Sequence, residues 1–185
     1  MADGGISGVS TGGGDFAGRD LTKMQITFSA GNLKELYKRF EEERRNNVHF
    51  NELLEELDVF QRQKSNETVV GLEAKLRAAK KTDELIEMAM ELKESYSKKL
   101  EKNKFFESAQ RINAYLLGYA RTQFVTYVYS EIKKGSNDDK VNVLMNQYVI
   151  QPMLSMLEGD TYGFTPQDIH GILYFLTGNC FIKWV

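Results

Sequence analysis

Hydrophobic residues recur at helical spacing from about residue 32 to the end of the chain, which predicts a mainly helical fold. The first helix is expected to begin at Asn32, whose side chain can cap it, with Glu35 in the capping-box position. Asn46-Asn47 interrupts the pattern, and two further apolar stripes then predict helices. The three stripes are Leu33, Leu36, Tyr37 and Phe40; Phe50, Leu53, Leu54, Leu57 and Phe60; and Val69, Leu72 and Leu76.

The second half of the pattern is longer and more apolar. A helix is expected after Thr82, an N-cap residue, and its apolar stripe continues to Leu100. Phe105–Lys134 is apolar on more than one face, which is typical of a central helix, and Gly118 is the expected point of a bend or close approach. Another apolar stripe follows from Val141 to Leu157.

The last two helices carry clear local signals. Pro152 lies inside the first of them and is expected to kink it. Thr165, Pro166 and Asp168 combine an N-cap, a proline in the first turn and a capping-box acid, so they predict the start of the last helix. Gly178 is its expected stop.

The first 31 residues differ from the rest because they contain 8 of the 15 glycines. Met24, Ile26 and Phe28 alternate with polar residues, which is the period of a strand. One or two such strands cannot bury a core alone. Residues 1–31 are therefore expected to be either a disordered tail or a β-forming head that pairs with other copies, and residues 32–185 a helical domain of about six to seven helices.

Charge and composition exclude several classes of function. Residues 32–104 carry 16 basic and 16 acidic residues, whereas residues 105–185 carry only 6 and 7, so the whole chain has no basic field to hold nucleic acid. One cysteine and two histidines exclude a disulfide framework and a zinc site made of these residues, and no P-loop motif is present. No segment has the length and apolar character of a membrane span or a signal peptide. We expect a cytoplasmic protein without a cofactor, a metal or a catalytic site.

Two candidate sites remain after these exclusions. Cys180 and His170 would form a thiol–imidazole pair if the fold brought them together, although a buried thiol and a partly exposed helical histidine are the simpler interpretation. The lysines of Lys98–Lys104 would contact a phosphate backbone if they formed a patch. Interspersed glutamates favour a solvated helix face instead, so direct nucleic-acid binding is not expected.

The stretch from Asp168 to Trp184 contains Leu-Tyr-Phe-Leu-Thr-Gly-Asn-Cys-Phe-Ile-Lys-Trp. This ending resembles the C-terminal domain of proteins in bacterial ABC three-component systems. Weaker similar blocks at Gly71–Leu76, Ser108–Ile112 and Tyr148–Pro152 extend the resemblance over roughly residues 48–185. The family pattern has a histidine where this chain has Phe181, so any partner role of that histidine is open here.

The head carries a second, shorter similarity. Gly14-Asp15-Phe16-Ala17-Gly18-Arg19-Asp20 is similar to Gly-Asp-Phe-x-Gly-Arg-Asp segments that precede domains in bacterial conflict and defence proteins.

The resemblance implies a function that composition and spacing do not. Proteins with this domain are expected to link an effector to an ABC-type ATPase in defence against phage. The resemblance therefore implies a non-catalytic adaptor whose partners are an ABC-type ATPase or an effector subunit. The alternative is a self-assembling scaffold that oligomerises through residues 1–31. The residues expected to mediate partner binding or self-assembly are Asp15, Phe16, Gly18, Arg19, Asp20, Asn179, Phe181, Lys183 and Trp184.

Overall fold

The computed structural model describes residues 30–62 and 69–185, which form helices with no strand among them. The prediction of a mainly helical fold is confirmed. Residues 1–29 lie outside the described residues, so the β-forming head stays a prediction. The elements are α2 (Ala30–Arg45), α3 (Glu55–Gln61), α4 (Leu72–Ala78), α5 (Asp83–Asn103), α6 (Glu107–Gln123), η1 (Phe124–Val128), α7 (Tyr129–Lys133), α8 (Asp138–Met145), η2 (Asn146–Ile150), α9 (Gln151–Met156) and α10 (Pro166–Gly178).

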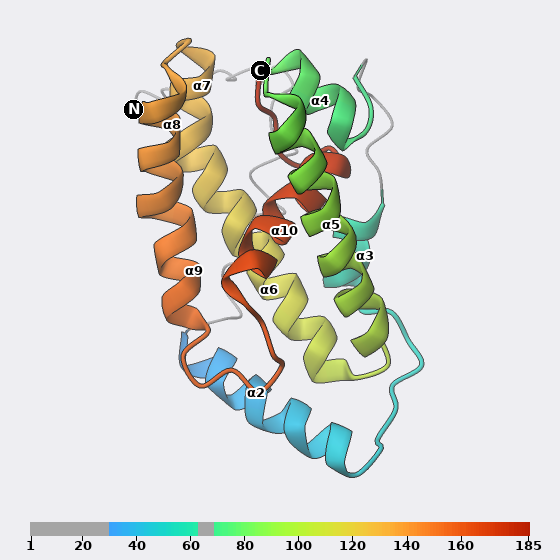
Figure 1. Cartoon of the computed structure of the whole chain (residues 1–185). Helices are drawn as coiled ribbons and strands as arrows, with labels where there is room; N and C mark the ends of the chain where they lie inside the picture. Colours follow the sequence, from blue (N-terminus) through green and yellow to red (C-terminus); the bar gives the residue numbers. More distant parts are fainter. Residues whose placement is uncertain (1–29, 63–68) are drawn as a thin grey trace, which may run out of the picture.

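Two long helical columns run side by side in the fold (Figure 1). The first consists of α6, η1 and α7, and the second of α8, η2 and α9. Gly135, with a φ of 71°, forms the turn between them, in a conformation that glycine adopts without a steric penalty. The expected long helix over 105–134 is therefore largely confirmed. We expected a bend at Gly118, but the helix departs from α geometry at Phe124. The wider π-helical segment η1 starts at that residue.

The second column shows how a proline fits inside a long helix. Pro152 lies in the first turn of α9, directly after the π-helical segment η2. Proline has no N–H to donate, and its ring crowds the carbonyl of the preceding turn. A π-helical turn widens the backbone just before the proline, so the helix continues past it.

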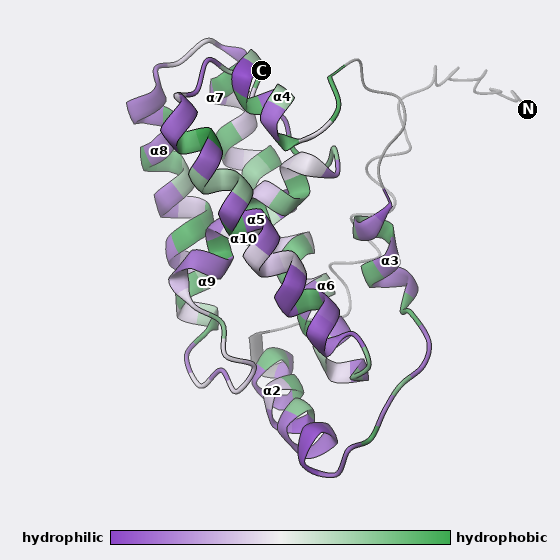
Figure 2. Ribbon diagram, turned by 45° about the vertical axis from the view of Figure 1, so that its right-hand side comes forward, coloured by the Kyte–Doolittle hydropathy of each residue, from purple (hydrophilic) through white to green (hydrophobic). Residues whose placement is uncertain are grey.

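The last helix, α10, lies between α5 and the α8–α9 column (Figure 1). From Ile169 to Gly178 every residue of α10 except His170 is buried, so this helix forms the centre of the core. A Cβ atom on Gly171 would lie only 2.7 Å from the Leu92 carbonyl oxygen, so α10 and α5 cross in close contact. In Figure 2 hydrophilic residues predominate along the visible side of α5, which faces solvent.

Helix α2 packs its apolar face on α6, and Leu33, Leu36, Tyr37 and Phe40 are all buried as the pattern predicts. The helix begins two residues before the expected cap, because Asn32 already lies inside it. The Glu43 carboxylate holds the start of α6: it accepts hydrogen bonds from the Ser108 N–H at 3.1 Å and from its hydroxyl at 2.6 Å. An acid at a helix N-terminus also interacts favourably with the helix dipole.

The second predicted stripe is helical only in its last part. Leu57 and Phe60 are buried on α3, but the preceding residues are not helical. The Gln110 side chain accepts from the Leu54 N–H and donates to the Glu52 carbonyl, both at 2.7 Å, and so satisfies this backbone from a distant helix. The third stripe is similar: Leu72 and Leu76 are buried on α4, whereas Val69 and Val70 are exposed before it. No helix in the described ranges has the length and apolar character needed to cross a membrane.

Candidate functional site

The predicted contact residues near the C-terminus follow the cap of α10. The Phe181 N–H donates to the Leu176 carbonyl at 2.8 Å, and the Cys180 N–H donates to the Thr177 carbonyl at 3.1 Å. These two bonds make a Schellman motif, in which the turning residue has a left-handed conformation. Here that residue is Cys180, with a φ of 67°, while the expected stop Gly178 is the last residue of the helix.

The first part of the C-terminal ending packs onto α3. The Asn179 side-chain amide donates to the Phe60 carbonyl at 2.9 Å. The Phe181 ring is buried, and its centroid lies 5.1 Å from that of Phe60. Asn179 and Phe181 therefore hold α3 against the end of α10, and this internal contact is the role that the structure shows for them.

The second part of the ending folds back over α10. The Trp184 indole N–H donates to the Thr177 hydroxyl at 3.0 Å, and its ring meets Phe124 edge to face at a centroid distance of 5.4 Å. Trp184 keeps part of its surface accessible, and Lys183 is exposed. Of the four predicted residues here, only Lys183 thus presents most of its side chain to a partner. The other predicted contact residues, Asp15, Phe16, Gly18, Arg19 and Asp20, lie outside the described residues.

The fold separates the two groups of the candidate thiol site. His170 lies eight residues before Gly178 on α10, which is about 12 Å along a helix axis. Cys180 follows Gly178, and its buried Sγ lies 4.0 Å from the Gly178 carbonyl oxygen. Burial lowers the pKa of His170, which favours the neutral ring. A base at this distance cannot take the thiol proton directly, so the structure does not form a thiol–imidazole pair.

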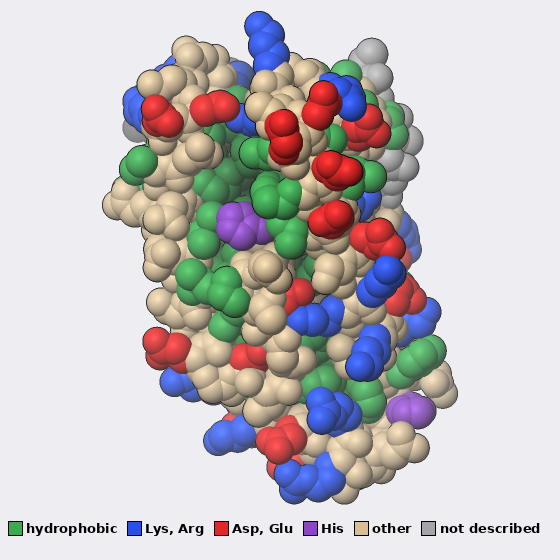
Figure 3. Space-filling model, viewed as in Figure 1, with side chains coloured by type: hydrophobic (Ala, Val, Ile, Leu, Met, Phe, Trp, Pro, Cys, Tyr) green, Lys and Arg blue, Asp and Glu red, His purple; other side chains and the backbone are tan. Residues whose placement is uncertain are grey.

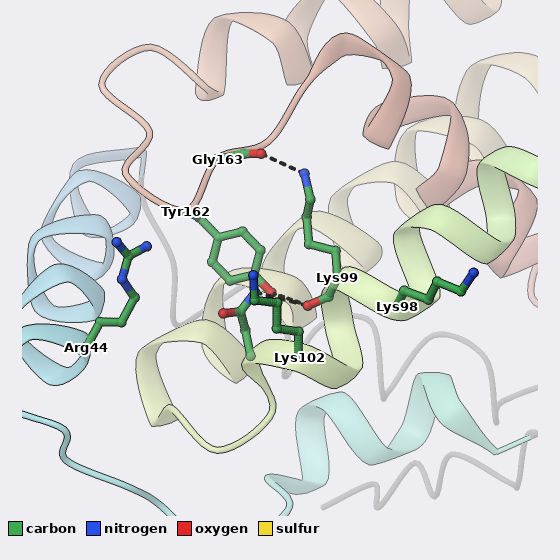
Figure 4. A pocket seen from close by; sticks show the side chains of 7 residues that line it. Arg44, Lys98, Lys99, Lys102, Tyr162 and Gly163 are labelled. Atoms are coloured by element: carbon green, nitrogen blue, oxygen red, sulfur yellow. Dashed lines mark hydrogen bonds between the residues drawn. The ribbon is translucent and has the colours of Figure 1, made fainter.

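The lysine cluster borders an open hollow of about 520 Å³ where α2, the last turns of α5 and the α9–α10 loop meet (Figure 4). Lys98 pairs with Glu94 at 2.6 Å and points away from the centre of the hollow in this view. Lys99 pairs with Asp168 at 2.5 Å. The Lys98–Glu94 pair matches the expected solvated helix face, whereas the Lys99–Asp168 pair is largely buried and ties α5 to α10. The full lining is Arg44, Lys98, Lys99, Lys102, Asn103, Tyr162 and Gly163.

The base of the hollow is a fixed aromatic ring. The Tyr162 hydroxyl accepts a hydrogen bond from the Asn113 amide at 3.0 Å and lies 3.4 Å from the Lys99 carbonyl oxygen. Burial raises the pKa of Tyr162 to about 12, so its hydroxyl stays protonated at neutral pH. Arg44 and Lys102 lie on either side of this ring (Figure 4).

A second surface feature was not identified from the sequence. No residue from Val141 to Leu157 is charged, and the solvent-facing side chains of this stretch are amides, hydroxyls and apolar groups. In Figure 3 charged side chains are dense along α5 and sparse over the middle of the α8–α9 column. We call this region the uncharged surface; it consists of Tyr127, Asn142, Val143, Asn146, Gln147, Tyr148 and Gln151.

Two tyrosines mark the edge of the uncharged surface. The rings of Tyr127 and Tyr148 stack at a centroid distance of 4.2 Å and an interplanar angle of 11°, and they connect the two π-helical segments. Protein interfaces are depleted in charge and enriched in tyrosine, so this surface has the composition of a docking face. The sequence did contain one signal for this surface, because residues 105–185 carry far fewer charges than residues 32–104. A low charge density is, however, equally typical of a region that only contributes residues to the hydrophobic core.

The comparisons with known proteins give one match. The family model for C-terminal domain 9 of the ABC-three component (ABC-3C) systems matches residues 71–184. This range includes the C-terminal ending, the uncharged surface and the part of the hollow that α5 and the α9–α10 loop supply. Neither the curated proteins nor the solved structures include a match to the chain.

Proposed function

The chain belongs to the family of C-terminal domain 9 of the ABC-three component systems, and from this membership we propose that it is a non-catalytic adaptor of such a system. In this proposal it links an ABC-type ATPase to the effector of the system, in defence against phage. The family membership supports participation in a multi-component system. The adaptor role, the ATPase partner and the defence role are the proposal itself.

The uncharged surface is the observation that carries the adaptor role. Val143 exposes 62% of its surface there, and Tyr127 exposes 41%. Neither side chain is part of the buried core, so both are available to a partner. A partner that covers this surface would bury apolar and aromatic groups without stripping water from charged side chains. We propose that it receives the ATPase component and that the C-terminal ending, through Lys183 and the accessible edge of Trp184, adds a second contact.

The test is a co-purification experiment. The tagged full-length chain is produced together with the ATPase and effector of its system, and the amount of ATPase that purifies with it is measured. Val143→Arg places a charge on the uncharged surface without entering the core, and we expect it to reduce the recovered ATPase by about tenfold or more. Met88→Arg is the matched control, because Met88 is 46% exposed on the charged helix α5. We expect the control to recover as much ATPase as the natural sequence.

Two outcomes contradict the proposal. The adaptor role fails if no ATPase is recovered with the natural chain. The assignment of the surface fails if Val143→Arg and Met88→Arg recover the same amount of ATPase.

A plaque assay on cells that carry each variant then tests the defence role. Protection against phage should be lost with Val143→Arg and kept with Met88→Arg.

A further inference from the structure

We propose that the hollow between α2, α5 and the α9–α10 loop binds acidic side chains of a protein partner. The hollow lies away from the uncharged surface, on different elements, so this inference does not rest on the proposed function. Its ligand would be a peptide segment rich in Asp or Glu. The inference follows from the ion pairs around the hollow: some of its basic side chains are paired with carboxylates, and others are not.

The carboxylates near the lining residues already have partners. Glu43, next to Arg44, binds Ser108 and Arg39. Glu101, next to Lys102, pairs with Lys104 at 2.7 Å.

Arg44 and Lys102 both line the hollow, and these carboxylates do not neutralise them. Within residues 30–62 and 69–185 neither Arg44 nor Lys102 forms an ion pair. The guanidinium carbon of Arg44 lies 6.0 Å from the centroid of the Phe40 ring. Two cations that line one hollow and form no ion pair with the acids of the described residues favour an anionic ligand.

The wall opposite α2 is held in place before any ligand binds. Lys99 donates to the Gly163 carbonyl at 2.6 Å and to Asp168 at 2.5 Å. The Asp160 carboxylate accepts from the backbone N–H groups of Tyr162 at 2.7 Å and Gly163 at 3.0 Å. A ligand would not have to order this loop, so less binding free energy would be lost on association.

The distribution of charge favours a carboxylate-bearing peptide over nucleic acid. A nucleic-acid strand needs a track of cations that continues along its phosphates. Here Glu94 and Glu101 lie on α5 beside the hollow, within one or two turns of Lys98 and Lys102, so a continuing strand would meet carboxylates. An aspartate or glutamate side chain instead places one anionic group between Arg44 and Lys102, with its short apolar stem over Tyr162.

The experiment measures binding of a fluorescent octaglutamate peptide to the full-length protein by anisotropy at low ionic strength, with octaglutamine as the uncharged reference. We expect octaglutamate to bind and octaglutamine not to bind. The double variant Arg44→Gln/Lys102→Gln should weaken binding by about tenfold or more, since each charge-assisted hydrogen bond contributes appreciably. Lys133→Gln/Lys134→Gln removes the same charge from the last residue of α7 and the residue that follows it, at the opposite end of the molecule from α2 (Figure 1), and should change binding by less than about twofold.

A second readout locates the ligand without any substitution. In a titration of the labelled natural protein, the amide NMR signals of Asn103 and Gly163 should shift with octaglutamate. The inference is overturned if octaglutamate binds no better than octaglutamine, or if both double variants lose binding equally. It is also overturned if oligothymidylate binds more tightly and is lost with Arg44→Gln/Lys102→Gln, because the hollow would then be a nucleic-acid contact.

Discussion

At the scale of single residues, two glycines of α10 look equivalent in sequence but have different surroundings. A Cβ on Gly171 would lie 2.7 Å from both the Leu92 carbonyl oxygen and the Tyr96 Cβ, and neither atom can move without its backbone. A Cβ on Gly178 would meet the Lys93 ammonium nitrogen at 2.7 Å, which is the end of a flexible side chain. Gly171 is therefore required by the helix crossing, whereas Gly178 is not.

This difference predicts opposite responses to alanine. Gly171→Ala should lower the free energy of unfolding by about 2 kcal/mol, because the crossing of α10 and α5 must widen. Gly178→Ala should be close to neutral, because the gain of helix propensity, up to about 1 kcal/mol, offsets the displacement of Lys93. Urea unfolding of both variants measures the two values. Equal destabilisation would contradict the assigned crossing point.

His170 gives a second prediction at this scale, through its pKa. Burial lowers the pKa of His170 below its ordinary value of 6.5. The unfolded chain therefore binds more protons than the fold between the lowered pKa and about pH 6.5, so stability falls as the pH is lowered through this range. His170→Gln should reduce that dependence, as measured by the urea midpoint at about pH 7 and about pH 5.5.

The exposed His49 provides the control for this prediction, because His49→Gln removes the other histidine of the chain. We expect this variant to keep the pH dependence of the natural protein. If His49→Gln flattened the dependence and His170→Gln left it unchanged, the assignment to His170 would be wrong.

At the scale of elements, the start of α10 combines a local cap with a long-range ion pair. One Asp168 carboxylate oxygen accepts from the Thr165 N–H at 2.7 Å and from the Thr165 hydroxyl at 2.8 Å. The same oxygen lies 2.5 Å from the Lys99 ammonium, and Asp168 is only 4% exposed. Asp168 therefore fixes α10 to α5 as well as capping its own helix.

This double role predicts an unequal cost for two neighbouring substitutions. Asp168→Ala should destabilise the protein by about 3 kcal/mol, because it leaves the partly buried Lys99 without its carboxylate. Thr165→Ala removes only part of the cap and should cost about 1 kcal/mol. Glu41→Ala breaks the ion pair with Arg45, in which both side chains are exposed, and should cost less than about 1 kcal/mol. Thermal unfolding of the three variants gives the order, and a cost for Asp168→Ala no larger than that for Thr165→Ala would refute the link to α5.

The elements also show which features the sequence could predict. The capping box at Thr165 and Asp168 and the cap at Thr82 depend on neighbouring residues, so the local pattern was sufficient. The non-helical segment before α3 depends on Gln110, more than fifty residues away, and no local pattern contains that information. The π-helical segments and the left-handed Cys180 are likewise set by packing: an apolar periodicity does not distinguish α from π geometry, and cysteine is not a residue that usually signals a turn.

The site was predictable to a smaller extent than the fold. The sequence placed Lys98–Lys104 on a charged helix face but could not reveal Arg44 across the hollow, since α2 is brought there by the tertiary fold. The C-terminal ending was identified through its family resemblance. That resemblance could not show that Asn179 and Phe181 face Phe60 inside the domain. Contacts between distant elements, rather than motifs, therefore decide which of the predicted residues are accessible.

At the scale of the whole molecule, the folding unit extends beyond the region that the family model matches. The match begins at residue 71, but Tyr37 and Phe40 of α2 and Phe60 of α3 belong to the same core cluster as α6 and α10. Removing α2 and α3 would expose the Phe181 ring and one face of α6 to solvent. The contacts that the structure describes thus join α2 and α3 to the same core as the matched region, and the boundary at residue 32 stays a prediction.

A truncation series tests this boundary and the role of the head together. Residues 30–185 should unfold cooperatively at nearly the same temperature as the full chain, because α2 and its contacts are retained, whereas residues 71–185 should lose a cooperative transition. Light scattering on a sizing column then compares the native mass of residues 30–185 with that of the full chain. A larger assembly of the full chain, reduced to a monomer by the truncation, would favour the self-assembling scaffold over the simple adaptor. The same small species for both would contradict oligomerisation through residues 1–31 and would favour the adaptor over the self-assembling scaffold.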